Sequence, residues 1–208
     1  MNRREMFNKM AAEWEATFQD AEKEAVMRDA LSRIGLATAH RILDLGCGAG
    51  KLIPLIREQT HPDSLIVALD YAEEMVKVAR KTYPEKYVSA IVGDAYALPF
   101  KDNSFDRIIL LAMLPHLPDK ARVLATLHRI LVPGGLVLIV HLAGRETIHR
   151  IHREHGGPLA HDTIPSGPEL SRLFLKARLQ PTKIIDSSDL YLAIARKDLD
   201  IAYQPQSQ

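Results

Sequence analysis

Residues 41–51, RILDLGCGAGK, decide the fold of this 208-residue chain. Ile42, Leu43 and Leu45 form a short apolar run that is typical of a buried parallel strand. Glycines spaced G-x-G-x-G follow it, and the next segment, LIPLIRE, predicts a helix. A strand, a glycine turn and a helix in this order bring backbone amides and a helix N-terminus close to a bound ligand. A side chain at the glycines would obstruct the turn or the ligand.

The spacing of the glycines and of the acids after them points to a nucleoside other than a nicotinamide dinucleotide. The dinucleotide motif G-x-G-x-x-G would need glycine where this chain has Lys51. The next apolar run, residues 64–69, ends in Asp70, which is placed to accept hydrogen bonds from a ribose diol. Asp94, after the run 87–92, can accept from an adenine amino group, although an acid there is also a common loop residue.

Five segments in chain order resemble the successive motifs of class I S-adenosylmethionine-dependent methyltransferases: ILDLGCGAG, VALDYAEEMVKVA, VGDAYALPF, FDRIILLAMLPHL and LVPGGLVLIV. The resemblance runs from about residue 7 to residue 140 and is closest to the ubiquinone/menaquinone-biosynthesis-like group of small-molecule methyltransferases. It implies S-adenosyl-L-methionine as the cofactor. Asp44, Gly46 and Gly48 would then line its methionine end. Asp70 would hold the ribose, and the segment 94–95 would meet the adenine.

Composition limits the classes of partner. The chain has 27 basic and 26 acidic residues, so charge gives no argument for nucleic acid or for an anionic membrane. Cys47 is the only cysteine, which excludes an internal disulfide or a zinc-type cysteine cluster. No apolar run approaches a membrane span, and the N-terminus is too polar for a secretory signal, so a cytoplasmic location is the default expectation. The segment 113–116, MLPH, replaces the motif of enzymes that methylate nucleobase amino groups.

The pattern predicts one α/β domain over residues 1–208: a Rossmann-like, seven-stranded, mostly parallel sheet with helices on both faces. Pro133-Gly134-Gly135 predicts a tight turn into a fifth strand at 136–141. The strand-like runs 184–187 and 190–195 are close enough for a hairpin, which gives one antiparallel strand near the C-terminus. Helices are expected at 20–34, 72–82 and 119–131.

Residues 1–35 are expected to form an N-terminal helical cap. Apolar side chains within residues 1–18 recur at roughly helical spacing, and the resemblance implies that this segment folds over the cofactor with Trp14 as the covering residue. Phe7, Trp14 and Phe18 packing on the core is the alternative. Ligands of open α/β sheets lie at the carboxyl ends of the strands. The cofactor candidates are Trp14, Asp44, Gly46, Cys47, Gly48, Asp70, Tyr71, Met75, Gly93, Asp94, Ala95 and Leu111.

The ends of the fourth predicted strand, 105–111, and of the fifth, 136–141, are left for the methyl acceptor, and a histidine lies at or shortly after each end. His116 and His141 are the catalytic candidates, either as a base or as a group that orients the acceptor, because histidine titrates near neutrality. Alternatively, His116 caps a turn and His141 is a satisfied polar residue. In-line methyl transfer needs alignment and a water-poor site more than a protein nucleophile.

Residues 144–168 are expected to form a lid over the acceptor, and histidines are concentrated there. His149 and His152 lie three apart, a spacing that can chelate a metal on a helix, but a polar cap over the substrate needs none and is favoured. The sequence therefore predicts a methyltransferase acting on a small molecule, and leaves a homodimer open. A nicotinamide dehydrogenase and a non-catalytic ligand- or metal-binding protein that uses the cluster from His141 to His161 are the alternatives.

Overall fold

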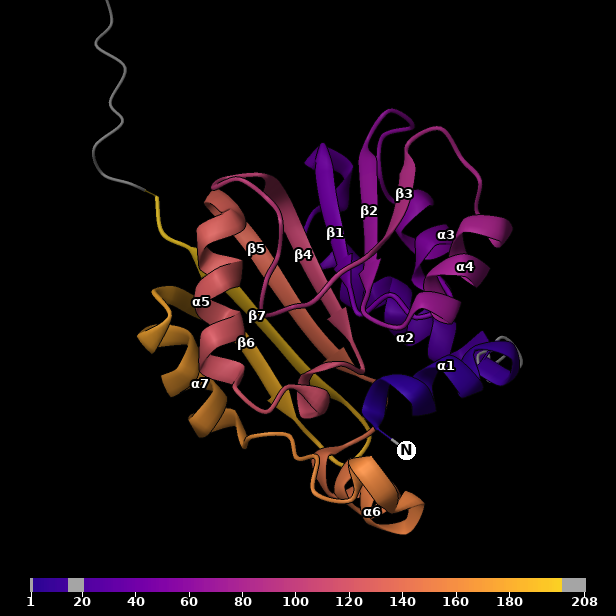
Figure 1. Cartoon of the computed structure of the whole chain (residues 1–208). Coiled ribbons are helices and arrows are strands. Elements are labelled where there is room, and N and C mark those ends of the chain that lie inside the picture. Colours follow the sequence, from indigo (N-terminus) through magenta and orange to yellow (C-terminus); the bar gives the residue numbers. More distant parts are fainter. Residues whose placement is uncertain (1, 15–20, 200–208) are drawn as a thin grey trace, which may run out of the picture.

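The computed structural model describes residues 2–14 and 21–199, and its centre is a seven-stranded sheet (Figure 1). The strand order is β3-β2-β1-β4-β5-β7-β6. β7 pairs antiparallel with both of its neighbours, and the other pairs are parallel. The predicted sheet, with one antiparallel strand near the C-terminus, is confirmed. The strands are β1 Arg41–Leu45, β2 Leu65–Asp70, β3 Val88–Val92, β4 Phe105–Leu111, β5 Leu131–His141, β6 Leu179–Asp186 and β7 Tyr191–Lys197.

Helices cover both faces of the sheet. The apolar stripes of α5 and α7 pack on one face, for example through Leu124 and Phe174, while α2 and α3 pack on the other through Leu31 and Ile56. α4 joins α3 over β2 and β3. The helices are α1 Arg3–Trp14, α2 Ala21–Ser32, α3 Leu52–Arg57, α4 Glu73–Thr82, α5 Lys120–Ile130, α6 Arg145–His155 and α7 Gly167–Lys176, with short 3₁₀ turns η1 Leu36–Thr38, η2 Leu114–His116 and η3 Gly157–Leu159. None of the described helices is long and apolar enough to cross a membrane.

Two strands begin earlier than the sequence pattern predicts. β5 starts at Leu131 rather than after the turn, because Leu131 pairs with Phe105 and the ladder resumes at Leu136 after a register shift. β6 starts at Leu179 and tolerates Pro181 because it is the edge strand, where a missing backbone donor costs little. Tertiary pairing extends both strands past the residues that would end them in isolation.

α1 and α6 lie beyond the ends at which the parallel strands finish, at the lower edge of Figure 1. α1 docks on the start of α4, where the Asn8 side-chain oxygen accepts a hydrogen bond from the Glu74 amide at 3.1 Å. Ala11 of α1 is buried against Ala49 and Met75. The first helix of the chain therefore packs over the glycine turn that follows β1.

Candidate active site

The glycine turn after β1 uses backbone conformations that other residues rarely adopt. Gly46 has φ +78° and Gly48 has φ +53°. A Cβ on Gly46 would lie 2.7 Å from the Met113 sulfur. The Gly48 amide donates a hydrogen bond of 2.9 Å to Oδ2 of Asp70, which joins the turn to the end of β2.

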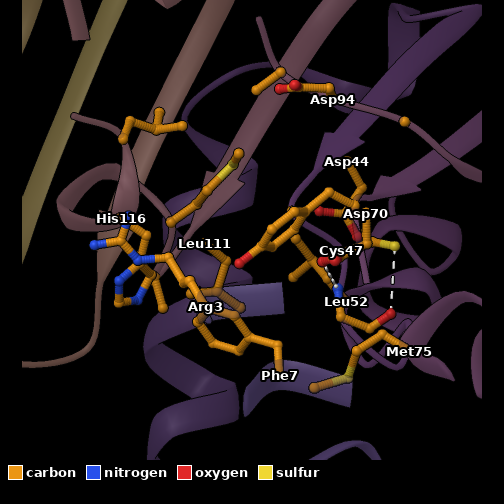
Figure 2. Close-up of a pocket in the computed structure, with 18 of the residues that line it drawn as sticks. Arg3, Phe7, Asp44, Cys47, Leu52, Asp70, Met75, Asp94, Leu111 and His116 are labelled. Atoms are coloured by element: carbon orange, nitrogen blue, oxygen red, sulfur yellow. Dashed lines mark hydrogen bonds between the residues drawn. The ribbon is translucent and has the colours of Figure 1, made fainter. Parts of the chain in front are cut away.

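This turn forms one side of a cavity of about 340 Å³. Figure 2 shows Asp44, Cys47 and Asp70 on one side of it and Arg3 and His116 on the other. All cofactor candidates except Trp14 line this cavity. The side chain of Trp14 lies outside the described residues, as does Phe18. The predicted residues on the wall are Asp44, Gly46, Cys47, Gly48, Asp70, Tyr71, Met75, Gly93, Asp94, Ala95, Leu111 and His116.

Asp44 is the most unusual group in this cavity. It is 1% exposed, and no described residue is a hydrogen-bond partner of its Oδ2. Burial, and then the charge of Asp70, raise the pKa of its carboxyl to about 7. Asp70 is better satisfied, because its Oδ1 accepts from the Ala72 amide at 2.8 Å as well as Oδ2 from Gly48. Burial nevertheless raises the pKa of Asp70. A buried carboxylate that lacks a partner is a site for a cationic or hydrogen-bonding ligand group.

Three other cofactor candidates on the cavity wall also make contacts that stabilise the local structure. The Oδ1 of Asp94 accepts the Tyr96 amide at 2.9 Å and so shapes its own turn. Met75 is 2% exposed and belongs to the small cluster under α1. The Tyr71 ring meets the Phe7 ring edge-on, with centroids 6.1 Å apart. Burial raises the pKa of Tyr71 to about 12, so its hydroxyl keeps its proton at neutral pH.

A second cavity, of about 330 Å³, adjoins the first. Phe7, Leu111, Ala112 and His116 line both cavities and form the shared wall. Ala112 has φ +54°, a strained value for a residue with a side chain, and strain of this kind is concentrated at functional sites. Most side chains of the second cavity are apolar, and its described lining residues include no carboxylate. Its polar members are Lys23, His116, His141, His152 and His155.

The two catalytic candidates differ in burial and in the cavities that they line. His141 lines only the second cavity, is 3% exposed, and has no described residue as a partner for its Nε2. Burial, followed by the neighbouring His116 and His152, lowers its pKa to about 3. His141 is therefore a neutral hydrogen-bonding group and a weak base. His116 lines both cavities, and its Nδ1 lies 2.6 Å from Oδ2 of Asp162.

The histidines of the predicted lid hold the loop after α6. His149 Nε2 accepts a hydrogen bond from the Ile164 amide at 2.9 Å, and His152 Nδ1 donates to the Asp162 carbonyl at 2.9 Å. Within residues 2–14 and 21–199, no group of three or more His, Cys, Asp or Glu side chains is arranged to hold a metal ion. The ring nitrogens serve the backbone of the lid, and the metal-binding alternative is not favoured.

Sequence reasoning missed the contact between Arg3 and Asp162. The Arg3 guanidinium pairs with Asp162 and also donates to the Pro158 carbonyl at 3.0 Å. No periodicity or motif signals this contact, because it joins residues 159 positions apart. The strained backbone of Ala112 is equally invisible in the sequence.

Comparison with known proteins shows what the chain is similar to. The family described as "Methyltransferase domain" matches residues 43–139. Demethylmenaquinone methyltransferases of Lactiplantibacillus plantarum and Lactococcus lactis are 33% and 30% identical over 112 and 142 residues, which is 52% and 65% of this chain. The matches cover 47% and 56% of those proteins, so the chain spans about half the length of the curated relatives it matches.

The fold has a close match among solved structures. A chain from the complex between the Haloferax volcanii Trm112 methyltransferase activator and a methyltransferase superposes with a TM-score of 0.79 at 22% identity. The match covers 92% of this chain and 97% of that one. The family match, the curated relatives and this fold agree with the motifs found in the sequence. Residues 43–139 therefore match a methyltransferase domain, and the chain is similar to demethylmenaquinone methyltransferases in sequence and to a methyltransferase complex in fold.

Proposed function

We propose that this protein transfers the methyl group of S-adenosylmethionine to a small-molecule acceptor held in the second cavity. The observation that carries the proposal is the pair of adjoining cavities. One is built from the glycine turn and the acids at the strand ends, the other is mostly apolar, and four residues line both. Direct transfer requires two compartments in contact, because donor and acceptor must meet in line.

The residues of the first cavity fit the cofactor. The unpartnered Oδ2 of Asp44 suits the ammonium group of a methionine moiety, and Asp70 has lone pairs left for ribose hydroxyls after its two backbone hydrogen bonds. Gly46 and Gly48 let a ligand approach the backbone closely. When bound, S-adenosylmethionine supplies an electrophilic methyl group on a sulfonium.

The chain's own contribution is alignment and exclusion of water. Phe7 of α1 lies on the shared wall, and α1 packs over the glycine turn, which supports the proposal that this helix is part of an N-terminal cap. Ile148 of α6 and Leu159 of the loop after it line the second cavity, which supports the proposal that this segment is a lid. A dry, closed site strengthens electrostatic interactions at the reacting atoms.

The lining of the second cavity supports an acceptor that is mostly apolar and carries no positive charge. Among the described lining residues none is a carboxylate, whereas Lys23 contributes a cation. A cationic amine would lack a counter-charge there, while an oxygen that becomes negative during transfer would be stabilised. Two relatives are named demethylmenaquinone methyltransferases, and this name supports a small-molecule acceptor.

Binding of the demethylated cofactor tests the proposal. We expect S-adenosylhomocysteine to raise the melting temperature, because a ligand that binds only the native state stabilises it, and we expect no shift from NADH. A shift with NADH alone would support a dehydrogenase and overturn the proposal. A crystal structure with S-adenosylhomocysteine should place it in the first cavity, and the remaining space would define the size of the acceptor.

A further inference from the structure

The His116 side chain is held by one carboxylate. Its Nδ1 lies 2.6 Å from Oδ2 of Asp162, whose side chain is 7% exposed, while the His116 side chain is 18% exposed. The Phe7 ring packs edge-on against the His116 ring at a centroid distance of 5.4 Å, and the His152 ring lies 5.1 Å away. The ring is thus fixed by packing as well as by a hydrogen bond.

This contact determines which nitrogen of His116 carries a proton. A carboxylate accepts hydrogen bonds, so Nδ1 must donate to Asp162. In the neutral ring, Nε2 then carries the lone pair, and it lies on the opposite side of the ring from Asp162. Because His116 lines both cavities, Nε2 is the nitrogen that can act on a molecule held there.

The other oxygen of Asp162 is also committed. Its Oδ1 pairs with the Arg3 guanidinium, which binds the Pro158 carbonyl as well. His152, which lies in α6, donates a hydrogen bond to the main-chain carbonyl of Asp162. α1, the turn after β4 and the loop after α6 therefore meet at this one aspartate.

We propose that Asp162 is a positioning residue that holds His116 in the Nδ1–H tautomer, so that Nε2 removes the proton of the methyl acceptor. The inference rests on the proposed function and adds the base to it. The acceptor's O–H bond breaks with its proton going to Nε2, the oxygen's electron pair forms the new bond to the methyl carbon, and the electrons of the carbon–sulfur bond stay on sulfur. General base assistance of this kind typically contributes about 10²–10⁴ in rate.

The substitution Asp162→Asn separates this role from a structural one. Arg3 can only donate, so it should keep the amide oxygen, and the amide NH₂ should then face His116. Nδ1 would have to accept, and the ring would change to the Nε2–H tautomer, which has no lone pair on Nε2. The change keeps the size of the side chain and both hydrogen bonds.

The test is ¹⁵N NMR of the full chain labelled at histidine, with His116→Gln used to assign the His116 signals. We expect the Nδ1–H tautomer in the wild type and the Nε2–H tautomer in Asp162→Asn. The matched control is Asp63→Asn, at an exposed carboxylate 3.8 Å from His61 Nδ1 and outside both cavities, which should leave the His116 tautomer unchanged.

Two results would overturn the inference: an Nε2–H tautomer at His116 in the wild type, or the same tautomer in the wild type and in Asp162→Asn. The wild-type spectrum decides the first without any variant that could misfold. Calorimetry with S-adenosylhomocysteine on the same samples tests the proposed function separately, because the tautomer does not depend on cofactor binding. Loss of that binding with the expected tautomers would refute methyl transfer while the Asp162–His116 pairing stands.

Discussion

The Asp70 carboxylate at the end of β2 accepts a hydrogen bond of 2.9 Å from the Gly48 amide in the turn after β1. The acid placed for a ribose and the glycines placed for close approach therefore form one unit. Asp70 also accepts from the Ala72 amide, one residue before α4 begins. The Asp70 carboxylate thus connects the ends of β1 and β2 to the start of α4, the helix on which α1 docks.

Replacing Asp70 should weaken cofactor binding. We expect Asp70→Ala to lower the affinity for S-adenosylhomocysteine by about 10- to 100-fold, because hydrogen bonds to a charged group are worth about 1.5–3 kcal/mol. Asp94→Ala, on the same wall but in an exposed loop, should cost less. Isothermal calorimetry measures both values. Unchanged affinity in Asp70→Ala would remove the ribose assignment.

Gly46 and Gly156 offer a matched pair of substitutions. Both have positive φ, +78° and +68°, so alanine at either position should cost about 1–2 kcal/mol of stability. The added Cβ at Gly46 would also meet the Met113 side chain on the cavity wall, whereas nothing lies within 4 Å of it at Gly156. We expect Gly46→Ala to lose cofactor affinity and Gly156→Ala to keep it. Equal affinities in calorimetry would show that the close approach at Gly46 is not needed.

The sequence predicted the sheet, its order of elements and the strand ends that line the first cavity. These features follow from local signals: apolar runs, turn glycines and acids at the tips of strands, such as Asp44 and Asp70. The start of β5 was missed because Leu131 joins the sheet only through its partner Phe105, across the register shift. Pairing of that kind is a tertiary effect that a local pattern does not contain.

The wall between the cavities could not be predicted for a similar reason. The pairing of Arg3 with Asp162 depends on the path of the loop after α6, which His149 and His152 hold by hydrogen bonds to its backbone. The histidines suggested a metal or a polar lid, and only the fold shows that two of them serve the loop. The cofactor and catalytic roles of the individual residues stay predictions until ligands are measured.

Asp44 and His141 should oppose each other in the dependence of stability on pH. The pKa of Asp44 is raised from 3.8 to about 7, so the folded chain holds a proton that the unfolded chain has released, and stability falls as pH rises through this range. The pKa of His141 is lowered from 6.5 to about 3, so its contribution is present above pH 6.5 and is lost as pH falls toward 3. Between about pH 4 and 6.5 the pH slopes of the two contributions are opposite in sign and cancel.

Single variants should reveal the two slopes. Relative to the wild type, Asp44→Asn should gain stability as pH rises by about 1.4 kcal/mol per unit, and His141→Gln should gain it as pH falls by a similar amount. Urea unfolding at several pH values between 4 and 6.5 measures the difference. Slopes of the same sign in both variants would contradict the assigned shifts.

Filling the second cavity should separate methyl transfer from cofactor binding. Ala143 follows β5, lines only the second cavity and is half-buried, so a tryptophan there should occupy the acceptor's space. We expect Ala143→Trp to bind S-adenosylhomocysteine within about twofold of the wild type and to transfer no methyl group. Ala97→Trp, at an exposed alanine outside both cavities, is the control and should keep both properties.

The measurement for these two variants pairs calorimetry with transfer of a labelled methyl group to a panel of small apolar hydroxyl compounds. The panel also tests the charge argument, since cationic amines of the same size should accept no label where the cavity offers Lys23 and histidines in place of a carboxylate. If Ala143→Trp transferred methyl groups at the wild-type rate, the acceptor would have to lie elsewhere, and the wall shared through Phe7 and His116 would lose its role in transfer. If the variant lost cofactor affinity as well, the two cavities would be one compartment rather than adjoining donor and acceptor sites.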